Sequence, residues 1–153
     1  MSREKQSLID ELFRFVALLE NSGDFIFSPV GLTVKTYSVL YLISTGIDTS
    51  RKLLAGSYGS KPNMTKKLKF LEENGFISRS VDSDDRRIFH FHLTKKSEEA
   101  LREITPTYEN ALREVFRGIQ ASDIALVTKV VTKSSDTLTE LLAAKKQCSN
   151  TEF

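Results

Sequence analysis

The spacing of apolar residues predicts a helix at the start of the chain. Between residues 4 and 20, apolar side chains recur at the i, i+3, i+4 and i+7 positions that form one face of a helix. These side chains are Leu8, Ile9, Leu12, Phe13, Val16 and Leu19. The run Asn-Ser-Gly-Asp at 21–24 favours turns and therefore predicts the end of this helix. Residues 25–31 are then expected to form a short apolar loop.

A second helix is predicted from Thr33 to about Ser44. Thr33 suits the N-cap position, because its hydroxyl can accept a hydrogen bond from a backbone N–H of the first turn. The β-branched and aromatic content of this segment would also suit a strand, so local propensity alone leaves the choice open. Its position directly before a helix-turn-helix pattern favours the helix.

The central stretch, Ile47–Thr94, has the pattern of a winged helix-turn-helix. A short helix is predicted to begin near Thr49, and residues 56–60 supply a glycine-bearing turn. A second helix is predicted from Lys61 to Asn74, with Pro62 in its first turn and Gly75 after its end. Three apolar residues of this helix are spaced at i, i+4 and i+7 and are expected to face inward: Met64, Leu68 and Leu71.

Two runs with alternating side chains predict a β-hairpin after these helices. Residues 76–81 and 87–93 alternate with the period of two that is typical of strands. The polar run Asp-Ser-Asp-Asp-Arg at 82–86 forms the predicted tip, which is the wing.

Long helices are predicted for the rest of the chain. Thr94 is a candidate cap for a helix whose apolar stripe continues to Ile119, with an expected kink at Pro106. A turn is predicted between Gly118 and Ser122, and a last helix from about Asp123. The tail 147–153 is expected to fray. The fold class is therefore mainly α with a small β-hairpin wing.

Composition limits the classes of protein that fit this pattern. The chain has 153 residues, of which 40% are hydrophobic and 27% charged, as in a globular protein with one domain or two lobes. Neither a secretory signal nor a membrane-spanning run is apparent, so a cytoplasmic protein without a membrane partner is expected. The one cysteine, Cys148, excludes an internal disulfide and a multi-cysteine zinc site.

Positive charge is concentrated in the central stretch, although the whole chain has a net charge of only +2. Residues 47–96 contain 11 Lys and Arg against 6 Asp and Glu. Such a concentration is typical of a surface that contacts phosphates, and double-stranded DNA is the expected partner. Solvated lysines on an ordinary helix surface remain the alternative interpretation.

The candidate DNA contacts lie on the polar face of the 61–74 helix and at the wing. Amide side chains can bind base edges in the major groove, and Lys can reach guanine or phosphate, so Asn63 is the first candidate for base contact. Arginines at the wing tip could enter the minor groove, with Asp85 bracing one of them. The full set is Ser60, Lys61, Asn63, Thr65, Lys66, Lys67, Lys69, Arg86 and Arg87.

Enzymatic and metal-dependent functions find no support in the sequence. The chain has no glycine-rich phosphate loop and no recognisable nucleophile setting, so no catalytic residue and no cofactor is predicted. His90 and His92 share one face of a predicted strand and could form a metal pair, but a third ligand is not evident. They are therefore predicted to be solvated strand residues.

The apolar stripes of the flanking helices exceed what a small winged helix needs to cover its core. Helices with surplus apolar surface usually meet a second copy through a two-fold axis, so a homodimer is expected. The predicted organisation is a helical dimerisation region at 1–24 and 97–147 around a winged helix-turn-helix DNA-binding domain at 30–96.

The run from Met64 to Arg79, Met-Thr-Lys-Lys-Leu-Lys-Phe-Leu-Glu-Glu-Asn-Gly-Phe-Ile-Ser-Arg, resembles a pattern of the MarR family of bacterial transcriptional regulators. The wing resembles the family's Asp-x-Arg-Asp-x-Arg followed by Leu-Thr. Its matches fall on Asp82, Asp85, Arg87, Leu93 and Thr94. The order of predicted elements agrees over nearly the whole chain. Where the family has its first wing arginine, this chain has Asp84, whose charge would repel phosphate.

The resemblance implies a dimeric, ligand- or signal-responsive repressor that binds a pseudo-palindromic operator. Effectors of such proteins are often small aromatic acids or phenols, held between the winged helix and the dimer helices. Candidate effector-binding residues are Phe13, Phe25, Phe27, Tyr37 and Tyr41, each of which is also a candidate for ordinary core packing. The alternative function is a winged-helix protein-interaction module, an adaptor or antirepressor, which Asp84 and the modest net charge would permit.

Overall fold

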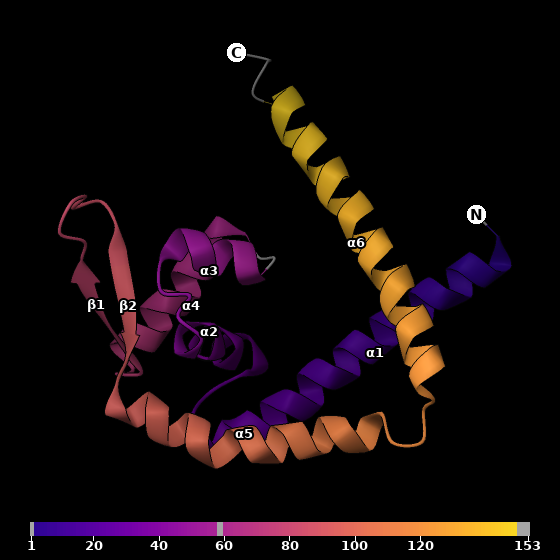
Figure 1. The fold of residues 1–153 in the computed structure, drawn as a ribbon, viewed down its shortest axis with the longest axis horizontal. Helices are drawn as coiled ribbons and strands as arrows, with labels where there is room; N and C mark the ends of the chain where they lie inside the picture. The colour runs from indigo at the N-terminus through magenta and orange to yellow at the C-terminus, as the bar shows by residue number, and fades with distance from the viewer. Residues whose placement is uncertain (1, 58–59, 150–153) are drawn as a thin grey trace. The chain divides into compact units, whose positions relative to one another are not determined.

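The computed structural model describes residues 2–57 and 60–149 and contains a mainly helical chain with an antiparallel hairpin, as the sequence predicts. Contacts divide the chain into two compact units that meet between Ala111 and Leu112. Figure 1 shows the elements in chain order, and they are α1 (Arg3–Phe27), η1 (Ser28–Val30), α2 (Val34–Ser44), α3 (Ser50–Ser57), α4 (Lys61–Glu73), β1 (Ile77–Val81), β2 (Phe89–Leu93), α5 (Lys95–Val115) and α6 (Ala121–Ser149). Two residues of the predicted 56–60 turn, Tyr58 and Gly59, lie outside the described residues.

Helix α1 is longer than the sequence pattern predicts. The predicted stop at 21–24 is wrong, because these residues and Phe25, Ile26 and Phe27 continue the helix. Gly23 does not end the helix but is buried against Val34 of α2, where a larger residue would collide. The carboxylate of Asp24 accepts a hydrogen bond of 2.8 Å from the backbone N–H of Val34, which further joins α1 to the start of α2.

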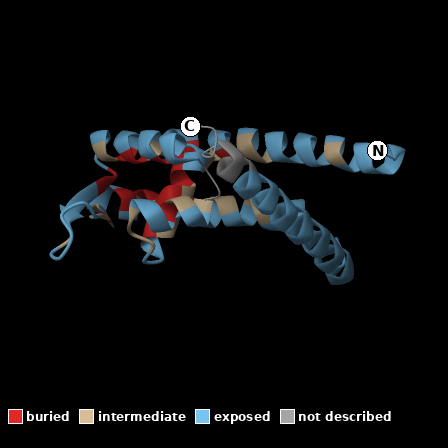
Figure 2. Ribbon diagram, turned by 90° about the horizontal axis from the view of Figure 1, so that it is seen from above, coloured by how far each residue is buried: buried red, intermediate tan, exposed pale blue. Residues whose placement is uncertain are grey.

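The core of the first unit lies among α2, α3, α4 and the hairpin, and it includes the end of α1 and the first half of α5. Thr33 caps α2 as predicted, in a capping box with Thr36. The three predicted inward-facing residues of α4 are all buried, as are Leu40 of α2 and Leu53 of α3. Figure 2 shows buried positions gathered in this region, whereas long stretches of ribbon elsewhere are exposed. The helical period of the sequence thus predicted correctly which side of α4 is buried.

The hairpin pairs Ile77 with Leu93 and Val81 with Phe89. Both strands are shorter than predicted, and Arg87 lies in the tip rather than in β2. The tip closes through two backbone hydrogen bonds, from Asp82 N to Ile88 O and from Ile88 N to Asp85 O, at 3.0 and 2.9 Å. The regular ladder begins at Phe89.

Thr94 marks the start of α5 as predicted. Its hydroxyl accepts a hydrogen bond from Ser97 N, and the Ser97 hydroxyl accepts one from Thr94 N, so each residue satisfies a backbone donor of the other. The helix continues through Pro106 without a break in its helical assignment. The kink expected at this residue stays a prediction.

The second unit contains the end of α5 and the whole of α6. Helix α6 begins at Ala121, two residues before the predicted start, and extends to Ser149, into the segment that was predicted to fray. The rest of that segment, 150–153, lies outside the described residues. All side chains of α6 from 121 to 144 are exposed, including Leu126, Val127, Leu138, Leu141 and Leu142.

In the described part of the chain, no single helix is long and apolar enough to span a membrane. One bent combination, α1 with η1 followed by α2 at an angle of 72°, meets the criteria of length and composition.

Candidate nucleic-acid interface

Helix α4 presents a largely cationic face, because Met64, Leu68 and Leu71 are buried in the core and only Phe70 among its large apolar residues is exposed. Lys61, Asn63, Thr65, Lys66 and Lys69 are exposed, and Lys67 is half-buried. The face therefore carries an amide side chain among ammonium groups that solvent can reach. Amides bind base edges in pairs, and ammonium groups contact phosphates, so the arrangement has the chemistry that a DNA groove requires.

The start of α4 is also suited to an anion. Ser60 occupies the N-cap position, with extended backbone angles, and its side chain makes no capping hydrogen bond. The first N–H groups of a helix have no partner inside the helix and carry partial positive charge. Ser60 and Lys61 therefore lie where a phosphate would be favoured.

Two of the predicted contact residues are engaged within α4. The Thr65 hydroxyl donates to the carbonyl oxygen of Lys61 at 3.0 Å. The Lys69 ammonium lies 3.6 Å from a carboxylate oxygen of Glu73. Both side chains of this ion pair are mostly exposed, so the pairing is weak and Lys69 stays accessible.

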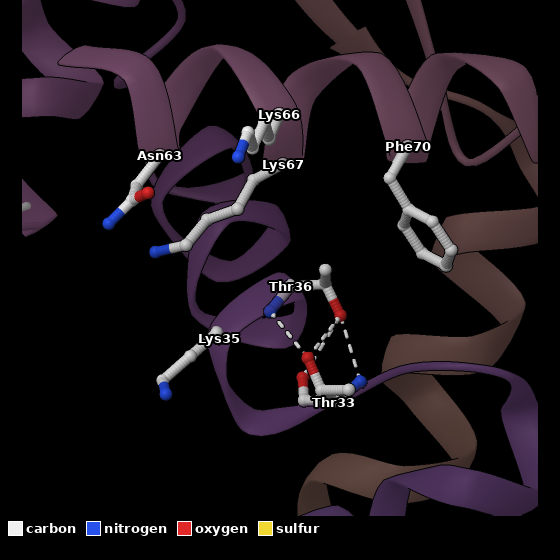
Figure 3. Close-up of a pocket in the computed structure, with 7 residues that line it drawn as sticks. All are labelled: Thr33, Lys35, Thr36, Asn63, Lys66, Lys67 and Phe70. Carbon is white, nitrogen blue, oxygen red and sulfur yellow. Dashed lines mark hydrogen bonds between the residues drawn. The ribbon is translucent and has the colours of Figure 1, made fainter. Parts of the chain in front are cut away.

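A pocket between α4 and the start of α2 collects further cationic groups (Figure 3). The α2 side contributes Thr33, Lys35 and Thr36, and the α4 side contributes Asn63, Lys66, Lys67 and Phe70. Lys35 was not predicted as a site residue. It also pairs with Glu20 of α1 at 3.0 Å, which offsets part of its charge. Sequence reasoning missed it because nothing local signals that the start of α2 lies beside α4.

The wing holds Arg86 and Arg87 in solvent. Both are exposed, and the Arg87 side chain is 95% exposed. Asp85 braces Arg87, because its carboxylate accepts the backbone N–H of Arg87 at 3.0 Å and lies 3.9 Å from the guanidinium Nε. Asp84 is exposed at the same tip, so an anion accompanies the arginines.

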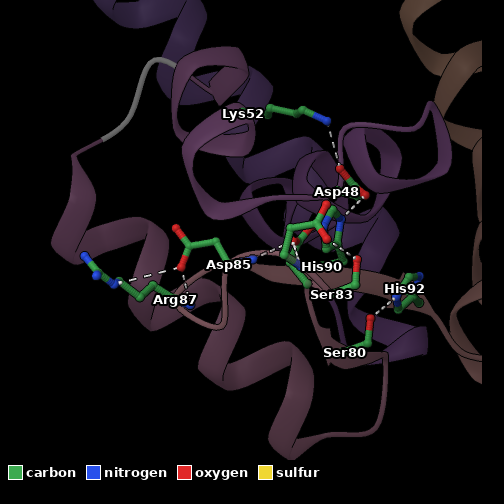
Figure 4. A network of polar contacts seen from close by, with 10 residues as sticks. Asp48, Lys52, Ser80, Ser83, Asp85, Arg87, His90 and His92 are labelled. Atoms are coloured by element: carbon green, nitrogen blue, oxygen red, sulfur yellow. Dashed lines mark hydrogen bonds and ion pairs between the residues drawn. The ribbon is translucent and has the colours of Figure 1, made fainter.

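His90 is not the solvated strand residue that the sequence predicts. Its Nδ1 lies 2.6 Å from a carboxylate oxygen of Asp48, and its Nε2 lies 2.9 Å from one of Asp82 (Figure 4). The hydrogen bond to Asp48, followed by that to Asp82, raises the pKa of His90. His92, in contrast, is exposed as predicted and bonds to the hydroxyl of Ser80 at 2.8 Å.

The pKa values of the two aspartates shift in the opposite direction to that of His90, because both are lowered. The backbone N–H of Asp85 and the ring of His90 lower the pKa of Asp82 to about 2. The hydrogen bond from His90 also lowers the pKa of Asp48, assisted by Lys52. In the described part of the chain, no group of three or more His, Cys, Asp or Glu side chains could hold a metal ion.

The structure brings only some of the candidate effector residues together. Phe27 is buried and stacks on Tyr37 with a centroid distance of 4.3 Å, and Tyr41 stacks on Tyr37 at 6.2 Å. Tyr108 of α5, which was not predicted, completes this aromatic cluster at 4.8 Å from Phe27. Phe13 and Phe25 are 72% and 82% exposed on α1 and have no place in the cluster.

The geometry defines a winged helix-turn-helix protein with a cationic exposed face on α4. Residues 32–89 match the sequence model of the MarR family. The central part of the chain is therefore similar to the MarR family.

Solved structures share this fold over nearly the whole chain. AbsC, a MarR family transcriptional regulator from Streptomyces coelicolor, superposes with a TM-score of 0.82 at 20% identity, covering 92% of this chain and 97% of AbsC. Sco3205 from the same organism, solved in complex with DNA, gives 0.82 at 19% identity and coverages of 90% and 93%. The S. aureus MepR–DNA complex gives 0.75 at 18% identity and coverages of 85% and 97%.

Proposed function

We propose that the chain is a homodimeric DNA-binding repressor that recognises a pseudo-palindromic operator. The observation that carries this proposal is the division of α4 into a buried apolar side and an exposed side with Asn63 and Lys66 at its centre. A helix of this kind fits the major groove, where its first turns lie deepest. Sco3205 and MepR, which share the fold, were both solved with DNA.

The roles of the contact residues follow from their positions. Asn63 reads a base edge, and Ser60 and Lys61 bind backbone or bases at the start of α4. The other predicted contact residues of the helix, Thr65, Lys66, Lys67 and Lys69, hold phosphates. Arg86 and Arg87 approach the adjacent minor groove from the wing. An operator on the chromosome would place this function in the cytoplasm.

The proposed dimer uses apolar side chains that one chain leaves exposed. On α1 these include Leu8, Leu12 and Val16, and on α6 Leu126, Leu138 and Leu141. Surfaces of this kind are normally covered by a partner. Residues 1–24 and 97–147 would form the dimerisation region and 30–96 the DNA-binding domain. A two-fold dimer would present two α4 helices to half-sites about 34 Å apart.

A small aromatic effector is part of the proposal, because aromatic side chains gather between α1, α2 and α5. The Tyr37 hydroxyl lies 3.2 Å from the hydroxyl of Thr105, so a polar group is present at the edge of this cluster. An aromatic acid or phenol could compete for such a hydroxyl pair and stack on Tyr41, which is half exposed.

The test is selection of bound duplexes from a random library, followed by sedimentation of the protein with and without the selected duplex. We expect an inverted repeat and a dimer that binds one duplex. Benzoate, salicylate and phenol would then be added to the complex to identify release. Failure to retard any duplex at low salt would overturn the proposal and favour the adaptor module, for which the exposed Asp84 is the supporting observation.

A further inference from the structure

The contacts of His90 join two parts of the fold that are distant in sequence. Asp48 lies in the connection between α2 and α3, and Asp82 lies where β1 gives way to the tip. Backbone contacts also join β2 to the connection between α2 and α3. Phe91 N donates a hydrogen bond to Asp48 O at 2.7 Å, and Thr49 forms an isolated antiparallel β-bridge with His90. The wing is thus attached to the helix-turn-helix through the Asp48–His90–Asp82 bridge.

The protonation state of the His90 ring decides whether both hydrogen bonds of this bridge can form. A neutral imidazole has one N–H and one acceptor nitrogen, and an ionised carboxylate can only accept. Two carboxylates on opposite ring nitrogens can both be hydrogen-bonded only when both nitrogens carry a proton. A neutral ring would leave one carboxylate facing a lone pair and would remove the positive charge that separates the two anions.

We propose that His90 is the positioning residue of the wing, and that its doubly protonated ring sets where Arg86 and Arg87 lie relative to α4. This inference rests on the proposed function, since the placement of the wing affects binding only if the wing and α4 contact one duplex. DNA binding by this chain therefore weakens as the ring loses its second proton.

The groups around the ring set the direction of the effect. Lys52 of α3 pairs with the other oxygen of Asp48 at 3.2 Å, and backbone N–H groups of Asp84 and Asp85 donate to the other oxygen of Asp82. Above pH 4 both carboxylates are ionised. From there up to its own pKa, the ring of His90 is doubly protonated. The raised pKa of His90 places the loss of the bridge above the ordinary histidine value of about 6.5.

The chain contains a matched control for this proposal. His92 is on the same strand two residues away, but it is exposed, and its ring bonds to the hydroxyl of Ser80 rather than to a carboxylate. His90→Gln and His92→Gln therefore remove the same chemical group from bridged and solvated positions. The affinity of wild-type protein and both variants for the selected duplex would be measured from pH 6 to 9 at constant ionic strength.

We expect wild-type affinity to fall by roughly 5-fold or more across this range, a coupling of ordinary size between two sites. His92→Gln should keep this profile, and His90→Gln should bind weakly at pH 6 and show a flat profile. Equal profiles for wild type and His90→Gln would overturn the proposal. Circular dichroism would establish that both variants are folded.

A second measurement does not depend on DNA. In an NMR titration of the free wild-type protein, the ring of His90 should titrate above pH 6.5, and the amides of residues 83–87 should shift with the same midpoint. A ring that titrates at or below the ordinary value, or wing amides that do not follow it, would refute the positioning role. If the wild-type protein binds no duplex at any pH, the proposed function fails, and this titration still decides whether the bridge holds the wing.

Discussion

Gly23 of α1 lies directly against Val34 of α2, so that a Cβ on the glycine would overlap Cγ2 of the valine. Gly23 is buried inside a continuous helix, where glycine is otherwise unfavourable. The close approach of the two helices therefore depends on the absence of a side chain at this position.

We expect Gly23→Ala to destabilise the protein, because overlap with the β-branched Val34 requires a shift of one helix. The free energy of unfolding should fall by about 1–3 kcal/mol, which exceeds the gain in helix propensity. Urea unfolding at fixed protein concentration measures the change. Ser22→Ala, at the exposed neighbouring position, is the control and should be neutral or slightly stabilising. A Gly23→Ala variant as stable as this control would contradict the packing argument.

Lys66→Ala should weaken binding to all duplexes, whatever their sequence. Loss of one phosphate contact should reduce the slope of log K against log salt by about 0.9. Affinity measured at four or more salt concentrations gives this slope. Lys133→Ala on the exposed surface of α6 is the matched control and should leave the slope unchanged. An unaltered slope for Lys66→Ala would remove this lysine from the interface.

Asn63→Ala should relax sequence discrimination rather than general affinity. Loss of a paired contact to a base edge costs roughly 1–3 kcal/mol of discrimination at one base pair. Binding to single-base variants of the selected duplex measures this effect. Asn21→Ala on α1 removes an exposed amide away from α4 and should preserve the pattern. If the base preferences of Asn63→Ala match those of wild type, Asn63 does not read a base.

Asp84→Asn should strengthen DNA binding. Asp84 is exposed at the same tip as Arg86 and Arg87, and its carboxylate accepts a hydrogen bond of 3.3 Å from the hydroxyl of Ser83. Removal of one exposed charge changes the free energy by roughly 0.2–1 kcal/mol, which is an affinity gain of about 1.5- to 5-fold. Asp136→Asn on α6 changes the net charge equally and serves as the control. Equal gains for both variants would point to net charge rather than to the wing.

Asp82 should titrate far below an ordinary aspartate. Hydrogen bonds from the backbone of Asp85 and from His90 lower its pKa from 3.8 to about 2. Because the folded pKa is lowered, the stabilisation is present above pH 3.8 and is lost as the pH falls through about 2. An NMR titration of the Asp82 carboxyl carbon measures the midpoint, and Asp82→Asn should remove this part of the acid dependence of stability. A midpoint near 3.8 would show that the turn does not favour the charged carboxylate.

Local patterns in the sequence were sufficient for most of the helical framework. The spacing of Met64, Leu68 and Leu71 predicted the buried side of α4, and it thereby predicted which lysines face outward. Thr33 and Thr94 were correctly predicted to cap α2 and α5. These predictions depend on interactions over three or four residues, which recur in the sequence at fixed spacing.

Only the tertiary structure decided the features whose partners lie far along the chain. Gly23 packs against Val34 inside a continuous helix, and Lys35 joins the cationic face because α2 packs beside α4. His90 meets Asp48, which lies 42 positions earlier in the chain. The sequence by itself determined the periodic elements, since their hydrogen bonds and apolar faces are local. The contacts of Gly23, Lys35 and His90 could be recognised only in the packed fold, because no spacing in the sequence indicates which distant side chains meet.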